Sequence, residues 1–165
     1  MKKLLAVLCI LLMLGTFYTA VAEDNPFAAP SGFDVKRKDA VYGKTVYHTY
    51  DSQTTSTERK CYVILPPEYD AEKAYPVLYL FHGIGGDHGE WMGGEPDVVV
   101  GNLINRGEAK EMIIVTPNIK AFPAGTITSG GMYSADAIAA FDNFINDFRD
   151  DLMPFIAKDF VEALI

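Results

Sequence analysis

The segment 75–86 constrains the fold of this 165-residue chain more than any other, and it reads Tyr-Pro-Val-Leu-Tyr-Leu-Phe-His-Gly-Ile-Gly-Gly. Residues 77–81 are all apolar, which is typical of a short strand covered by helices on both faces. The strand ends abruptly at His82, and only glycines follow Ile84 directly. We therefore expect the backbone N–H group of Ile84, helped by that of Gly85, to point outward and to bind a developing negative charge.

Three further strands are expected from the pattern of apolar residues. Residues 41–50 alternate between apolar and polar, and 58–65 do the same after a polar stretch that suits a hairpin loop at 51–57. A proline pair ends the second of these strands. The short apolar run 112–115 predicts another buried strand.

Two helices are expected between and after these strands. Residues 97–106 follow a proline and precede Gly107, which suits a short helix. From 134 to 160, apolar residues recur at steps of three and four, and Pro154 should kink or divide this helix. Two antiparallel strands followed by strand–loop–helix units predict an α/β fold with a mostly parallel sheet.

The N-terminal 22 residues have the features of a signal peptide. Lys2 and Lys3 precede a short apolar run, and Ala20-Val21-Ala22 provides a small-x-small cleavage site. We expect export, to the periplasm or outside the cell, with no membrane contact after cleavage. A flexible leader at 23–40, rich in proline, alanine and glycine near its start, should precede the domain at 41–165.

Composition excludes some classes of partner. The net charge is −8, and removing two lysines with the signal makes it −10, so nucleic acid and anionic membranes are poor partners. Cys9 leaves with the signal, so Cys61 cannot form an internal disulfide. It lies within a strand pattern and is expected to be a buried, inert thiol.

The groups needed for acyl transfer through a serine are incomplete. That chemistry requires a nucleophile, a histidine base, a carboxylate and an oxyanion hole. No serine has glycines at both −2 and +2, and Ser129 comes nearest. His82 is interpreted as a structural brace for its loop, and His88 as a solvent-exposed residue rather than a metal ligand. Trp91 is expected either to wall a pocket or to pack against the following helix.

Three parts of the chain together resemble a known family: residues 59–70, residues 75–86 and Trp91. Residues 59–70 read Arg-Lys-Cys-Tyr-Val-Ile-Leu-Pro-Pro-Glu-Tyr-Asp. This family comprises the secreted carbohydrate esterases, including feruloyl and acetylxylan esterases, which are similar to esterase D and the mycolyltransferases. Residues 112–118 resemble its next strand, and 142–160 resemble the helix before its nucleophile strand.

The resemblance implies a serine carboxylesterase with the α/β-hydrolase fold and with no metal or cofactor. Its substrate would be an acylated plant polysaccharide such as xylan, or a small ester, from which feruloyl or acetyl groups are removed. Ile84 matches the oxyanion-hole position, Gly85 adjoins it, and Trp91 matches a pocket position. The family's serine, acid and histidine have no counterpart, so the chain would be the N-terminal half of the sheet, truncated before the nucleophile elbow.

We expect this chain alone to be inactive. Two other functions stay open: a non-catalytic module that binds polysaccharide, and an acyltransferase of the same superfamily. The sequence does not specify the oligomeric state.

Overall fold

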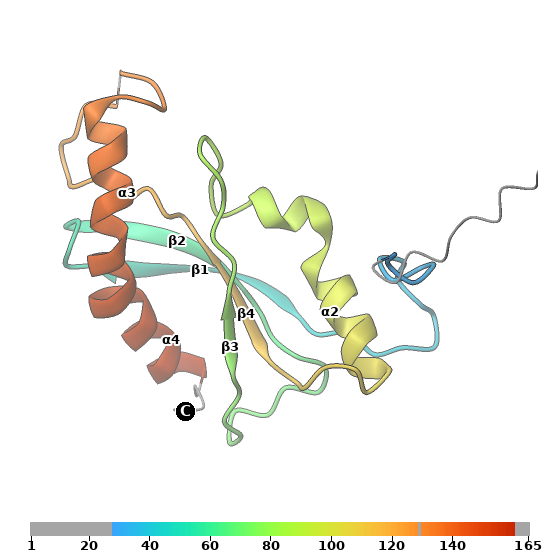
Figure 1. Ribbon diagram of the computed structural model, residues 1–165. Coiled ribbons are helices and arrows are strands. Elements are labelled where there is room, and N and C mark those ends of the chain that lie inside the picture. Colours follow the sequence, from blue (N-terminus) through green and yellow to red (C-terminus); the bar gives the residue numbers. More distant parts are fainter. Residues whose placement is uncertain (1–27, 129, 161–165) are drawn as a thin grey trace, which may run out of the picture. The chain divides into compact units, whose positions relative to one another are not determined.

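The computed structural model describes residues 28–128 and 130–160 (Figure 1). The chain divides into two units, Met1–Ser31 and Gly32–Ile165. Only residues 28–31 of the first unit are described, and the predicted signal peptide lies outside the described residues. All the helices and strands below belong to the second unit. Within the described residues, no helix is long and apolar enough to cross a membrane.

The second unit is built on a mixed sheet with the strand order β1-β2-β4-β3. Its strands are β1 (Thr45–Ser52), β2 (Thr57–Ile64), β3 (Val77–Tyr79) and β4 (Ile113–Pro117). The β2 strand pairs antiparallel with both β1 and β4, whereas β3 and β4 are parallel. The predicted order of two antiparallel strands followed by parallel strands is confirmed.

The hairpin between β1 and β2 is tighter than the predicted loop at 51–57. Ser52 pairs with Thr57, so the strands extend further into the polar stretch than expected. The reason is a distant partner: the carboxylate of Asp151 accepts hydrogen bonds from the backbone N–H groups of Gln53 and Thr54 and from the Ser52 hydroxyl. Burial raises the pKa of Asp151, but these hydrogen bonds outweigh burial and the pKa is lowered.

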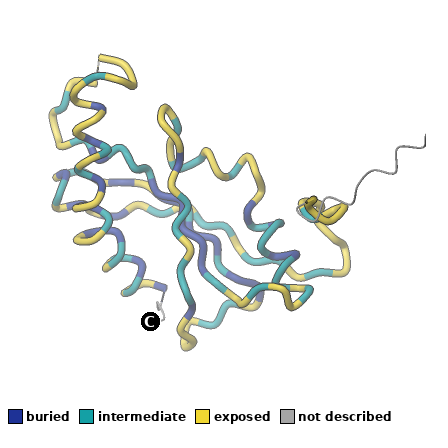
Figure 2. The backbone as a smooth tube through the Cα atoms, viewed as in Figure 1, coloured by how far each residue is buried: buried dark blue, intermediate teal, exposed yellow. Residues whose placement is uncertain are grey.

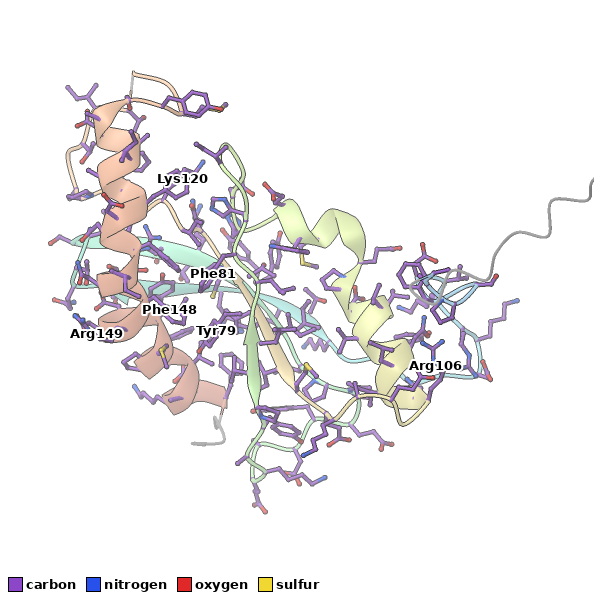
Figure 3. All side chains as sticks on the ribbon, in the orientation of Figure 1. Tyr79, Phe81, Arg106, Lys120, Phe148 and Arg149 are labelled. Atoms are coloured by element: carbon purple, nitrogen blue, oxygen red, sulfur yellow. The ribbon has the colours of Figure 1, made fainter. Side chains whose placement is uncertain are left out.

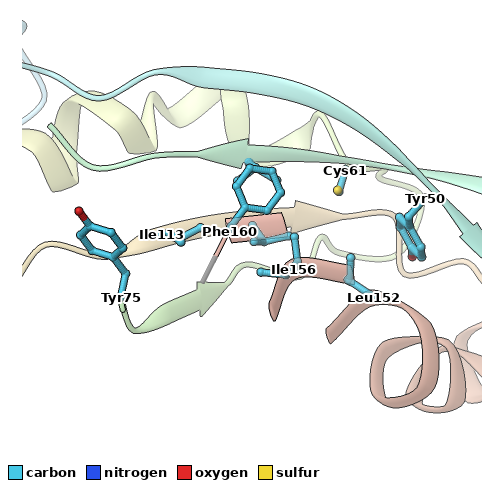
Figure 4. Close-up of a cluster of buried hydrophobic side chains, with 9 residues drawn as sticks. Tyr50, Cys61, Tyr75, Ile113, Leu152, Ile156 and Phe160 are labelled. Atoms are coloured by element: carbon cyan, nitrogen blue, oxygen red, sulfur yellow. The ribbon is translucent and has the colours of Figure 1, made fainter. Parts of the chain in front are cut away.

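Helices cover both faces of the sheet. Helix α2 (Pro96–Asn105) lies on the face that carries Ile64 and Ile114, and its residues Val100 and Ile104 line one small cavity with them. The C-terminal helices pack on the opposite face, where alternate residues of β2 and β4 point. The core on that face contains Tyr50, Cys61, Val63, Tyr75, Ile113, Val115, Leu152, Ile156 and Phe160 (Figure 4).

The predicted helix at 134–160 is confirmed and is divided as Pro154 requires. It consists of α3 (Ala135–Asp147), a wide π-helical turn η2 (Phe148–Leu152) and α4 (Met153–Phe160). The Ser134 side chain caps the start of α3 by accepting from the Ala137 N–H. Pro154 has no N–H group and its ring crowds the carbonyl four residues earlier, so the turn that precedes it opens.

The strand β3 is less buried than its apolar sequence predicts. Residues 77–81 were expected to be covered on both faces, yet Leu78 is 39% exposed and Phe81 is 42% exposed. This expectation is wrong because, among the strands that the structure describes, β3 lies at the end of the order, with β4 as its one hydrogen-bonded neighbour. Figure 2 shows burial along the middle of the sheet and exposed residues in the loop that follows β3.

The second half of the predicted leader is hydrogen-bonded to α2. The fully buried side chain of Asn102 donates to the carbonyls of Phe33 and Val35 and accepts from the Tyr42 hydroxyl. A side chain at Gly101 would meet the Tyr42 ring at 2.7 Å, so this close approach requires glycine. The leader at 23–40 as a whole stays a prediction.

Candidate active site

The turn after β3 is held by its own residues. The Gly86 N–H donates to the Gly83 carbonyl over 3.1 Å, and Gly85 has a φ of +87°, a conformation that favours glycine. The Glu90 carboxylate, on the short helix η1 (Glu90–Gly94), accepts from the Gly83 N–H at 2.9 Å. These contacts fix the path of the backbone between β3 and η1.

The amides of Ile84 and Gly85 are the groups that this turn leaves available. Among the described residues, neither N–H donates to a protein acceptor, and both residues are exposed at the surface. Two adjacent unpaired N–H groups on a fixed turn can hold a carboxylate or a developing oxyanion.

A cavity of about 330 Å³ lies beside Gly85, and we call it the Gly85 cavity. Its wall is mostly apolar, and Phe122, Met132 and Phe141 provide the large side chains. Lys120 and Thr128 add the polar groups. A concave, largely apolar pocket with a few polar groups of this size suits a small aromatic ligand.

His82 connects the turn after β3 to the loop after β4. It is buried, and its Nε2 lies 2.9 Å from the Ile119 backbone nitrogen and 3.2 Å from Asn118 Oδ1, while its Nδ1 lies 2.7 Å from the Gly83 carbonyl oxygen. Both ring nitrogens therefore have hydrogen-bond partners within the protein. The predicted role of His82 as a structural brace is confirmed.

A buried ion pair supports the loop after β4. Arg59 and Asp147 have side chains that are 6% and 0% exposed, and their Nε and Oδ2 atoms are 3.1 Å apart. The guanidinium also donates to the carbonyls of Asn118 and Lys120, and Tyr50 donates its hydroxyl proton to Asp147. One cation thus connects β2, α3 and the loop that forms the cavity wall.

A second cavity, of about 470 Å³, shares Lys120 and Phe122 with the first, and we call it the Lys60 cavity. Its other lining groups are polar or charged: Thr57, Glu58, Arg59, Lys60, Asp87, His88 and Asn118. Helix α3 contributes to the Gly85 cavity, whereas β2 contributes to the Lys60 cavity. Figure 3 shows Lys120 between α3 and the loop that follows β3.

His88 is not the solvent-exposed residue that the sequence suggested. Its ring stacks on Tyr62 at 5.5 Å and lies 5.6 Å from the Tyr47 ring, and burial lowers its pKa. The prediction was wrong because these tyrosines are on the neighbouring strands β1 and β2, which local sequence does not bring near. Within the described part of the chain, no group of three or more histidine, cysteine, aspartate or glutamate side chains is arranged to hold a metal.

The other predicted residues have different outcomes. Cys61 is fully buried and burial raises its pKa to about 12, which confirms an inert thiol. Ser129 lies outside the described residues. Trp91 donates its indole N–H to the Phe81 carbonyl at 2.9 Å and is 42% exposed. It does not line either of the two cavities, and its role in a pocket stays a prediction.

Lys120, Phe122 and Met132 line the Gly85 cavity but were not predicted as site residues, because they lie in the irregular stretch between the predicted strand at 112–115 and the predicted helix at 134–160. Phe141 belongs to the apolar repeat that predicted the helix at 134–160, and it too was not predicted as a site residue. Large apolar residues inside a glycine-rich loop were the signal that could have indicated a cavity wall.

This mixed sheet with helices on both faces is the architecture of the first half of an α/β-hydrolase. The structure is similar to a CE1 ferulic acid esterase from Anaeromyces mucronatus, solved with ferulic acid. The TM-score is 0.75 and the identity is 33%, over 82% of this chain and 50% of that one. A feruloyl esterase module from Clostridium thermocellum, complexed with sinapinate, shares the fold at a TM-score of 0.62 and 23% identity, over 81% of this chain and 41% of that module.

The chain belongs to the Esterase family, described as "Putative esterase", whose profile matches residues 52–163. It is also 29% identical, over 81% of its length, to an endo-1,4-beta-xylanase/feruloyl esterase of Xylanibacter ruminicola. It spans half the length of the Anaeromyces esterase and 18% of the Xylanibacter protein. The predicted α/β fold and the resemblance to feruloyl esterases are confirmed.

Proposed function

We propose that this chain supplies the oxyanion-binding amides and the acyl-binding cavity of a carboxylic ester hydrolase that removes feruloyl or acetyl groups from plant polysaccharide. The observation that supports this most is that the N–H groups of Ile84 and Gly85 have no protein acceptor among the described residues, and that Gly85 lines the cavity. An ester carbonyl at these amides would direct its acyl group into the cavity, between Phe122 and Phe141.

The amides would act by stabilising negative charge on the carbonyl oxygen. Losing one oxyanion-hole donor typically costs about 2.7–4 kcal/mol of transition-state stabilisation. The fixed φ of Gly85 and the hydrogen bond from Gly83 to Glu90 would hold the donors in place before substrate binds. His82 would keep the turn at a constant distance from the loop at Ile119.

We assign no nucleophile to this chain. The serine mechanism requires a Gly-x-Ser-x-Gly turn with an acid and a base, and no such turn occurs in the printed sequence. We infer that the chain by itself does not hydrolyse methyl ferulate at enzyme-like rates, and that it is exported through its N-terminal signal. Rapid hydrolysis that Ser129→Ala abolishes would contradict the first of these inferences.

The test of the proposal is a nuclear magnetic resonance titration of the ¹⁵N-labelled chain with ferulate, whose carboxylate imitates the oxyanion. We expect the amide signals of Ile84 and Gly85 to shift in a saturable manner, and Phe141→Leu to weaken binding severalfold. Ile127→Ala is the matched control, because Ile127 is exposed and lines neither of the two cavities. Saturable binding that leaves both amides unmoved would refute the proposal.

A further inference from the structure

The Gly85 cavity and the Lys60 cavity differ in chemistry although they share a wall. Lys120 and Phe122 line both cavities. Of the residues that line the Gly85 cavity, Lys120 is the one charged residue. The Lys60 cavity has acids and bases from two separate segments, β2 and the loop after β3. Both volumes, about 330 and 470 Å³, lie within the range typical of ligand sites.

The polar groups that line the Lys60 cavity include both hydrogen-bond donors and acceptors. Glu58 and Asp87 accept hydrogen bonds, whereas Lys60 and Lys120 donate them. Arg59 contributes little to a ligand, because its guanidinium is occupied by Asp147 and by two backbone carbonyls. A cavity lined by both carboxylates and ammonium groups does not favour a strongly charged ligand of either sign. It suits a neutral ligand with several hydroxyl groups, each of which can donate and accept.

The shared wall suits a ligand that is aromatic at one end and hydroxylated at the other. Phe122 offers an apolar surface to both cavities, and Lys120 lies where the two meet. The amide of Gly85 is at the edge of the apolar cavity, so an ester carbonyl held there would have its acyl group on one side. Its alcohol would then extend past Lys120 toward the polar cavity.

We propose that the Lys60 cavity is a glycosyl subsite, which binds the sugar residue whose ester-linked acyl group occupies the Gly85 cavity. This inference rests on the proposed function and adds the location of the alcohol. Glu58 and Lys60 are the residues that hold the sugar hydroxyls, and Phe122 contacts both parts of the substrate. The site selects esters of neutral saccharides over esters of simple alcohols.

The experiment compares the binding of three probes to the full chain, by ligand-detected magnetic resonance at micromolar protein concentration. The probes are methyl ferulate, a feruloylated arabinoxylan oligosaccharide, and the same oligosaccharide without the acyl group. The double variant Glu58→Ala/Lys60→Ala alters only the Lys60 cavity, and both side chains are exposed, so the fold is retained. The matched control is Lys110→Ala/Glu111→Ala, an exposed pair that lines neither cavity.

We expect the feruloylated oligosaccharide to bind about tenfold more tightly than methyl ferulate, which corresponds to about 1.4 kcal/mol. The Glu58→Ala/Lys60→Ala variant should lose this advantage while its affinity for methyl ferulate is unchanged. Equal binding of the two ferulate probes, or no effect of the double variant, would overturn the subsite and leave the proposed function intact. Oligosaccharide binding that only this variant removes, without ferulate binding, would support the subsite and refute the proposed function. Failure of all three probes to bind would refute both.

Discussion

Replacing Arg59 with methionine should destabilise the fold more than any exposed charge substitution. The side chains of Arg59 and Asp147 are 6% and 0% exposed, so Arg59→Met leaves a carboxylate in the core with the Tyr50 hydroxyl as its remaining partner. Removing one member of a buried ion pair typically costs about 3–5 kcal/mol. Against a total stability of about 5–15 kcal/mol for an ordinary domain, this is a large share.

The assay is urea unfolding followed by circular dichroism at pH 7, with the transition midpoint as the readout. Arg149→Met is the matched control, because Arg149 lies in η2, the turn that directly follows Asp147, and forms a 2.6 Å ion pair with Asp150. Figure 3 shows where Arg149 lies on this helix. That pair is largely exposed to solvent, and its loss should scarcely move the midpoint. The double variant Arg59→Met/Asp147→Leu should recover much of the stability, since it removes the unpaired charge.

Two results would refute this reasoning. If Arg59→Met shifted the midpoint no more than Arg149→Met, the buried pair would not be holding the loop after β4 in place. If the double variant were no more stable than Arg59→Met, the loss would arise from packing and from the unpaired carbonyls of Asn118 and Lys120, not from the carboxylate.

Three further predictions concern other parts of the fold. His82→Ala should lower the free energy of unfolding by about 1–3 kcal/mol, because the N–H of Ile119 loses its acceptor. The same urea assay measures this loss, and an unchanged midpoint would contradict the bracing role of His82. The pKa of Asp151 is lower in the folded protein than in the unfolded chain, where it is about 3.9. The ionised carboxylate therefore stabilises the fold fully above the unfolded-state pKa, and this contribution is lost as the pH falls through the folded-state pKa. Melting temperatures against pH should therefore show Asp151→Asn as destabilising at pH 7 and without effect at the acid extreme, and a constant difference would argue against this linkage. Leu78→Lys should reduce concentration-dependent self-association in light scattering, because Leu78 lies on the exposed edge strand β3; equal association of both chains would locate the contact elsewhere.

The parts of the fold that depend on residues close together in the sequence were predictable from it. The strand pattern at 58–65 correctly predicted that Cys61 is buried, and the break at Pro154 followed from its missing N–H. The turn at Ile84 and Gly85 was recognisable because glycines act locally on the backbone.

What the sequence did not reveal depends on partners far along the chain. Arg59 and Asp147 are separated by 88 positions, and nothing near either residue indicates the other. The burial of β3 was overestimated because an apolar strand at the edge of a sheet has the same composition as a central one. The cavity wall at Phe122 and Met132 was missed for a similar reason, since these residues acquire a role only where α3 and the Gly85 turn meet them.

The wide turn η2 has a consequence for how a straight helix follows a twisted sheet. Residues that face the sheet from the C-terminal helices recur at intervals of four: Ala140, Phe144, Phe148, Leu152, Ile156 and Phe160. In a regular α-helix, four residues turn about 40° more than one full revolution. The direction of these side chains would therefore drift around the helix, and the last of them would point into water. One additional residue in η2 rewinds the phase by roughly 100°, which returns Ile156 and Phe160 to the β-strands. The π-helical turn that precedes Pro154 thus keeps the apolar residues of α3, η2 and α4 on the side that faces the sheet.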